Sequence, residues 1–161
     1  MLEFFGLPTH ILLLHAVVVF SPLAALGGIL YAVVSRWRRA TEWPVAVLAV
    51  VSAGFAVVTA SAGERLEEAL PSEPLIREHA EHGDLLKVVA VIFAGLVILL
   101  VLETGPWTAR RLPQLDRLRA LPWLRILLQV LTVLGGLFLI YQTIVTGHSG
   151  AAATWADWKK G

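Results

Sequence analysis

Residues 85–102 read LLKVVAVIFAGLVILLVL, an apolar run in which Lys87 is the only charged residue. At 1.5 Å per residue, a helix of this length nearly crosses a hydrocarbon core of about 30 Å. Three further apolar runs cover residues 11–34, 44–62 and 126–146. These runs are continuous and do not alternate with period two, which argues against a barrel. We therefore predict an all-α polytopic membrane protein, a bundle of four transmembrane helices forming a single domain over residues 1–161.

The composition agrees with this prediction. The chain has 161 residues, of which 57% are hydrophobic and 16% charged, and its mean hydropathy is +0.75. Soluble domains contain about 45–50% apolar and about 25% charged residues, so this chain needs the lipid bilayer as its solvent. A formal net charge of +1 gives no reason to expect nucleic acid as a partner. The lack of cysteine excludes disulfides, thiolate metal ligands and covalent haem attachment.

Charge is distributed unevenly between the loops. Two loops are rich in arginine and contain Arg36, Arg38, Arg39, Arg110, Arg111, Arg117, Arg119 and Arg125. The central loop is acidic and contains Glu64, Glu67, Glu68, Glu73, Glu78, Glu81 and Asp84. The positive-inside rule then predicts that the arginine-rich loops are cytoplasmic, and that the central loop and both termini lie on the outer side.

The two halves of the chain resemble each other weakly. The second span ends with VTASAG at residues 58–63, the fourth ends with VTGHSG at residues 145–150, and the first and third spans both begin near a histidine. This pattern is typical of two helical hairpins in parallel repeat, related by an axis along the membrane normal. Small residues within the spans are expected to allow close helix packing, namely Gly27, Gly28, Gly54, Gly95, Gly135 and Gly136.

The histidines all lie near the predicted outer side, at His10, His15, His79, His82 and His148. His15 lies about one turn inside an apolar run, where an ionisable residue usually faces the bundle interior and has a partner. His10 precedes it by five residues, which places the two rings roughly 140° apart around the helix. We therefore expect His15 to be the principal ligand, paired with His82 or His79, and His10 to be peripheral.

Within residues 71–84, PSEPLIREHAEHGD, Ser72 can cap a helix and Pro74 suits its first turn. We therefore predict a helix that begins here and continues from the aqueous side into the third span. His79 and His82 would share a face, and Glu78 would pair with His82 at i, i+4. Glu64 and His148 would complete a polar ring drawn from all four helices. Such a ring could hold haem b by axial histidines from two helices. Alternatively it could hold a Cu, Zn or Fe ion, for which the predicted ligands are His15, His82, Glu64 and Glu78.

Four motifs carry a resemblance to a known family: LPTHILLLHAVVVFSPLAAL at residues 7–26, SAGERLEEAL at 61–70, EHAEHGD at 78–84 and GHSGAAATW at 147–155. Over nearly the whole chain the sequence resembles an uncharacterised family of small bacterial four-helix membrane proteins, a domain-of-unknown-function family. The family's paired N-terminal histidines correspond to His10 and His15, although its proline after the first histidine is Ile11 here. The resemblance implies a bacterial cytoplasmic membrane location and redox-cofactor binding through these histidines, without identifying the cofactor.

Together these features predict a small integral membrane protein that holds haem b, or alternatively a non-haem metal ion, near its outer face and acts in electron transfer. The competing hypothesis is a structural or assembly subunit of a membrane complex, whose histidines are hydrogen-bonded and bind no ligand. A redox partner, a membrane-complex partner and an oligomer are all compatible with the sequence. A hydrolytic enzyme is disfavoured, because the sequence contains no nucleophile elbow, phosphate loop or HExxH motif.

Overall fold

The computed structural model describes residues 3–4 and 7–156. Its body consists of four long helices, α1 (Thr9–Val33), α2 (Arg38–Glu67), α3 (Pro74–Thr104) and α6 (Pro122–Thr154). These helices coincide with the four predicted apolar runs, and each is long and apolar enough to cross a membrane. The prediction of an all-α membrane bundle is thereby confirmed. The helices extend past the predicted spans, and α3 continues through residues 74–84 as expected.

Short elements connect the long helices. The α1–α2 connection contains η1 (Ser35–Trp37), and the α3–α6 connection contains α4 (Pro106–Arg111), η2 (Pro113–Leu115) and α5 (Asp116–Arg119). Two strands of two residues each, β1 (Glu3–Phe4) and β2 (Leu7–Pro8), pair antiparallel ahead of α1. This strand pair was not predicted from the sequence.

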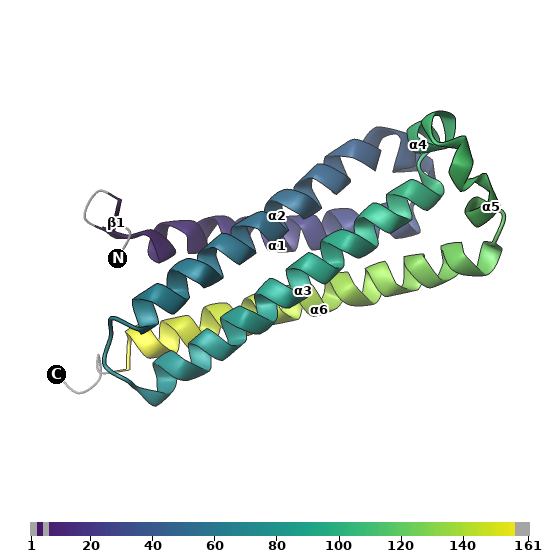
Figure 1. Cartoon of the computed structure of the whole chain (residues 1–161). Coiled ribbons are helices and arrows are strands. Elements are labelled where there is room, and N and C mark those ends of the chain that lie inside the picture. The colour runs from purple at the N-terminus through teal and green to yellow at the C-terminus, as the bar shows by residue number, and fades with distance from the viewer. Residues whose placement is uncertain (1–2, 5–6, 157–161) are drawn as a thin grey trace.

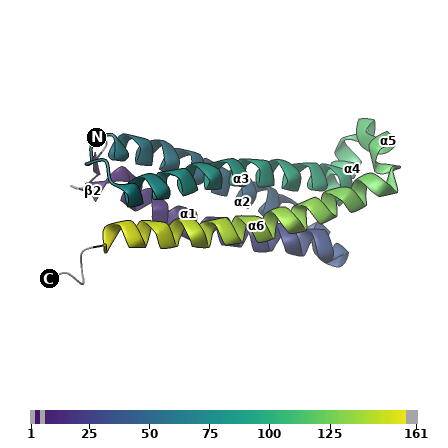
Figure 2. The ribbon, with the colours of Figure 1, turned by 90° about the horizontal axis from the view of Figure 1, so that it is seen from below.

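The four long helices run side by side and antiparallel in chain order (Figures 1 and 2). α1 and α3 each pack against both α2 and α6, so that α1 and α3 face each other across the diagonal of the bundle. One end of the bundle, here called the histidine end, contains the start of α1, the α2–α3 loop and the end of α6 (Figure 1). The opposite end, here called the arginine end, contains η1, α4 and α5. All the histidines therefore lie at one end, as the sequence predicts.

Aromatic and aliphatic side chains fill the space between the helices. Phe93 and Leu139 are almost completely buried. Gly28 packs directly on Phe93, because a Cβ at Gly28 would lie 2.6 Å from the ring, inside van der Waals contact. The packing prediction is wrong for Gly54 and Gly95, since an added Cβ at either position would meet nothing within 4 Å. Many Val, Leu and Ile side chains on the outside of the bundle are exposed, as expected for a surface that faces lipid.

One buried hydrogen bond links the first two helices within the apolar part of the bundle. The hydroxyl of Ser52 on α2 donates to the hydroxyl of Ser21 on α1 at 3.1 Å. Both side chains are excluded from the surface. Such bonds between membrane helices satisfy groups that lipid cannot solvate.

Polar side chains at the arginine end satisfy backbone groups that the helix ends leave free. The buried carboxylate of Glu42 accepts hydrogen bonds from the backbone N–H groups of Trp107 and Thr108, each at 3.0 Å, at the first turn of α4. The guanidinium of Arg38 donates to the carbonyl of Ala32 near the end of α1 at 3.1 Å. An anion at a helix N-terminus and a cation at a C-terminus both match the helix dipole. These contacts hold α4 against α2 and close this end of the bundle.

Candidate cofactor site

His10 on α1 and His79 on α3 meet across the diagonal at the histidine end. Their ring centres are 6.1 Å apart, and the ring planes are inclined at 78°. Both residues are partly buried. The predicted contact between the first and third spans at this end is therefore present, but His10 makes it, and not His15.

The position of His10 fixes which of its nitrogens carries hydrogen. Its Nδ1 lies 2.9 Å from the backbone carbonyl of Thr59 on α2. A carbonyl oxygen only accepts, so Nδ1 is the donor, and Nε2 of the neutral ring keeps its lone pair. A bond from one ring nitrogen to a carbonyl is the usual way in which proteins orient an imidazole that binds metal through the other nitrogen.

His79 is held in the same tautomer by α6. Its Nδ1 lies 3.1 Å from the hydroxyl oxygen of Ser149, which is buried. Ser149 in turn donates its own hydrogen to the carbonyl of Thr146 at 2.9 Å, so its oxygen accepts from His79. The site thus presents two imidazoles, each hydrogen-bonded through Nδ1, so that the neutral form of each ring has its lone pair on Nε2.

The two halves of the chain provide matching surroundings for these rings. Residues of the VTASAG motif, including Gly63, lie against His10, and residues of the VTGHSG motif, including Gly150, lie against His79. This correspondence supports two parallel hairpin repeats, with the histidine pair where the halves meet. The repeated motif was the signal in the sequence that could have identified His10 and His79 as partners.

His15 does not face the bundle interior. Its side chain is exposed, and its Nδ1 lies 2.8 Å from the carbonyl of Ile11, one turn earlier on the same helix. The predicted pairing of His15 with His82 or His79 is therefore wrong. The reason is the rotation of α1: because His10 points inward, a residue roughly 140° further around the helix points outward.

The remaining histidines lie apart from the pair. Nε2 of His82 is 3.9 Å from a carboxylate oxygen of Glu78, in agreement with the predicted i, i+4 relation, and Glu78 is exposed. The backbone carbonyl of His82 accepts hydrogen bonds from the side chains of Gln142 and Thr146, both at 3.1 Å, which ties α3 to α6. His148 is exposed on α6.

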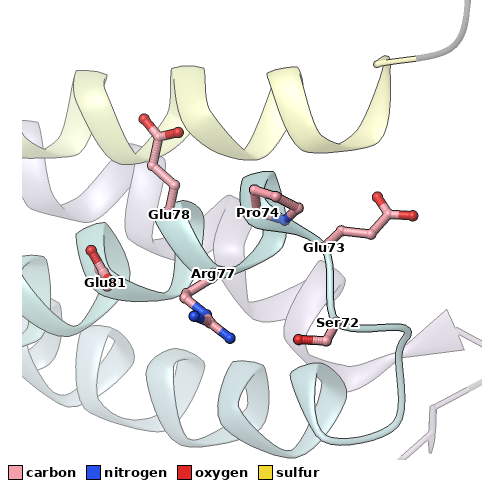
Figure 3. A pocket seen from close by; sticks show the side chains of 6 residues that line it. All are labelled: Ser72, Glu73, Pro74, Arg77, Glu78 and Glu81. Atoms are coloured by element: carbon pink, nitrogen blue, oxygen red, sulfur yellow. The ribbon is translucent and has the colours of Figure 1, made fainter.

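Neither carboxylate predicted as a metal ligand, Glu64 or Glu78, lies at the histidine pair. Glu64 forms an ion pair with Lys87 at 3.2 Å, and Lys87 also pairs with Asp84 at 2.7 Å. Figure 3 shows a surface pocket at the start of α3, in which the side chains of Glu78 and Arg77 point to opposite sides. The pocket is lined by Ser72, Glu73, Pro74, Arg77, Glu78 and Glu81.

The described part of the chain contains no group of three or more His, Asp or Glu side chains that could hold a metal ion. The predicted set of His15, His82, Glu64 and Glu78 is therefore not assembled in this structure. Two of its members, His82 and Glu78, are neighbours. His15 is exposed on the outer face of α1 and does not join them. What the fold does bring together is a pair of imidazoles.

The fold defines a small multi-pass membrane protein, a four-helix bundle with a histidine pair at one end. The chain belongs to the family described as predicted membrane protein (DUF2231), whose model matches residues 6–158. This match confirms the resemblance to an uncharacterised domain-of-unknown-function family. No curated protein and no solved structure matches the chain.

Proposed function

We propose that this protein binds haem b between His10 and His79 and transfers single electrons at the outer face of a bacterial cytoplasmic membrane. The proposal rests on the histidine pair itself. Its rings come from two helices, their centres are 6.1 Å apart, and both Nδ1 atoms are hydrogen-bonded to neighbouring helices.

The donor set fits haem better than a non-haem metal ion. Haem brings most of the ligands of its own iron, so two histidines from facing helices would be enough to hold it here. A zinc site built by protein side chains needs three or four ligands, and the described residues bring no third His, Asp or Glu to this pair.

Haem b, when bound, supplies a reversible one-electron couple. His10 and His79 would hold the iron through Nε2. The carbonyl of Thr59 and the hydroxyl of Ser149 would fix the two rings and make them more basic, which stabilises the oxidised iron. Partial burial of both rings would limit the access of water, which is a second determinant of the potential.

The distribution of charge supports an orientation for this electron transfer. The arginine end belongs in the cytoplasm by the positive-inside rule, which places the histidine end and both termini on the outer side. A redox partner or a larger membrane complex would then meet the site from that side. The acidic α2–α3 loop lies beside it, so a partner with a basic surface would be steered to the site.

Titration of the purified protein with haem, followed by the Soret absorbance, tests the proposal. We expect the wild type to bind one haem per chain and the variants His10→Ala and His79→Ala to lose tight binding. The controls His15→Ala and His148→Ala remove exposed rings and should bind as the wild type does. A wild type that takes up no haem would refute the proposal, and if it takes up no metal ion either, the result would favour an assembly subunit. Loss of binding in His15→Ala with retention in His10→Ala would refute the assignment of the pair.

A further inference from the structure

Gly63 on α2 and Gly150 on α6 lie against the two histidine rings. A Cβ added at Gly63 would lie 3.0 Å from both Cε1 and Nδ1 of His10. A Cβ added at Gly150 would lie 2.8 Å from Cε1 and 3.2 Å from Nδ1 of His79. Carbon atoms pack best at about 3.5–4.0 Å. A methyl group at Gly150 would therefore force the His79 ring to move, and one at Gly63 would push the His10 ring by a few tenths of an ångström.

These contacts distinguish Gly63 from Gly54 on α2, and Gly150 from Gly147 on α6. A Cβ added at Gly54 on α2 or at Gly147 on α6 would meet nothing within 4 Å. Glycine is a poor residue for a helix interior, since it leaves the backbone free in the unfolded chain. At Gly63 and Gly150 the missing side chain has a specific consequence, which is the close approach of an imidazole to the neighbouring helix.

We infer that Gly63 and Gly150 are positioning residues, each of which leaves the space that seats one imidazole of the pair against α2 or α6. Each seat lies beside the hydrogen-bond partner of the ring that it holds, Thr59 for His10 and Ser149 for His79. The separation of the rings is therefore set by α2 and α6 as well as by the helices that carry the histidines. The link to haem rests on the proposed function, whereas the seating of the rings is a property of the protein without cofactor.

A double-mutant cycle on the cofactor-free protein tests the seating directly. Gly150→Ala should lower the midpoint of thermal unfolding in detergent, and the matched control Gly147→Ala should leave it unchanged or raise it. In a His79→Ala background the ring is gone, so Gly150→Ala should no longer lower the midpoint. An equal loss with and without the His79 ring, or no difference between Gly150→Ala and Gly147→Ala, would overturn the inference.

The other half of the chain offers an independent repetition of the cycle. Gly63→Ala should also lower the unfolding midpoint, and His10→Ala should remove that effect. Gly54→Ala is the control on the same helix. A destabilisation by Gly63→Ala that persists in the His10→Ala background would contradict the role of Gly63.

The haem-loaded protein gives a second readout that a merely structural glycine would not affect. Gly150→Ala should shift the absorption spectrum from low-spin towards high-spin haem, because a displaced His79 binds the iron less well. Gly147→Ala should leave the spectrum unchanged. An unaltered spectrum of Gly150→Ala would refute the link to the cofactor. If the wild type binds no haem, the proposed function fails, while the unfolding cycle still decides whether the glycines seat the rings.

Discussion

The substitution Ser149→Ala isolates the hydrogen bond that orients His79. It removes the hydroxyl that accepts a hydrogen bond from Nδ1 of His79 at 3.1 Å. The same hydroxyl donates to the carbonyl of Thr146 at 2.9 Å, and this bond is lost as well. Ser149 is buried, so water does not easily replace it. Leaving a buried donor unpaired costs about 1–3 kcal/mol. Loss of a group that orients a metal-binding histidine lowers affinity by about 10–100-fold, which corresponds to about 1.4–2.8 kcal/mol.

The first estimate applies to the stability of the protein and the second to binding, and from the second we expect haem affinity to fall by at least about tenfold in Ser149→Ala. If the ring moves to bond the Thr146 carbonyl directly, the loss will lie at the lower limit. The assay is a haem titration of the wild type, Ser149→Ala and the control Thr154→Ala. Thr154 is exposed, and its hydroxyl donates to the carbonyl of Gly150 within its own helix at 2.9 Å. Equal affinity in the wild type and Ser149→Ala would refute the claim that this hydroxyl holds a ligand.

Three further predictions concern the topology and the packing of the bundle. Cysteines introduced at Ser35 and Ser72 should react with an impermeant thiol reagent from opposite sides of the membrane, and reaction at Ser35 from the outside would reverse the proposed orientation. Glu42→Ala removes two hydrogen bonds to a charged acceptor, each worth about 1.5–3 kcal/mol, so it should lower the free energy of unfolding by about 3–6 kcal/mol. Glu68 is exposed, so the control Glu68→Ala should change the free energy of unfolding by no more than about 0.5 kcal/mol in the same denaturation experiment. A similar effect of both variants would contradict the role given to Glu42. Ser52→Ala should lower the free energy of unfolding by about 0.6 kcal/mol, which is typical of a hydrogen bond between membrane helices. A decrease above about 2 kcal/mol would contradict the view that Ser52 contributes only this bond.

The number of long helices and the grouping of the histidines at one end could be predicted from the sequence. Both follow from hydropathy and from alternation of the spans across the bilayer, and neither requires knowledge of how a helix is rotated. The rotation of α1 could not be predicted in the same way. Val17 faces the core and Val18 is exposed, yet both are apolar, because lipid and protein interior favour the same residues. The apolar pattern of a membrane helix therefore gives little indication of its inward face.

The choice between His10 and His15 depended on this rotation. The depth of His15 in an apolar run favoured it as the inward-facing ligand, since a ring at that level needs a hydrogen-bond partner. The structure supplies that partner locally, through the carbonyl of Ile11 on the same helix, so that no second helix is required. For His10 the partner is the carbonyl of Thr59 on α2. The roughly 140° between the rings meant that one of them would point away from the bundle, without telling which.

The measurement that tests the central claim most directly is the visible absorption spectrum of the wild-type protein purified from membranes of cells supplied with haem. We expect a Soret band and, after reduction, the sharp bands of low-spin haem, and we expect both to be lost when His79 is replaced by alanine. A wild-type protein that purifies without a Soret band and acquires none when haem is added would contradict haem binding by this pair.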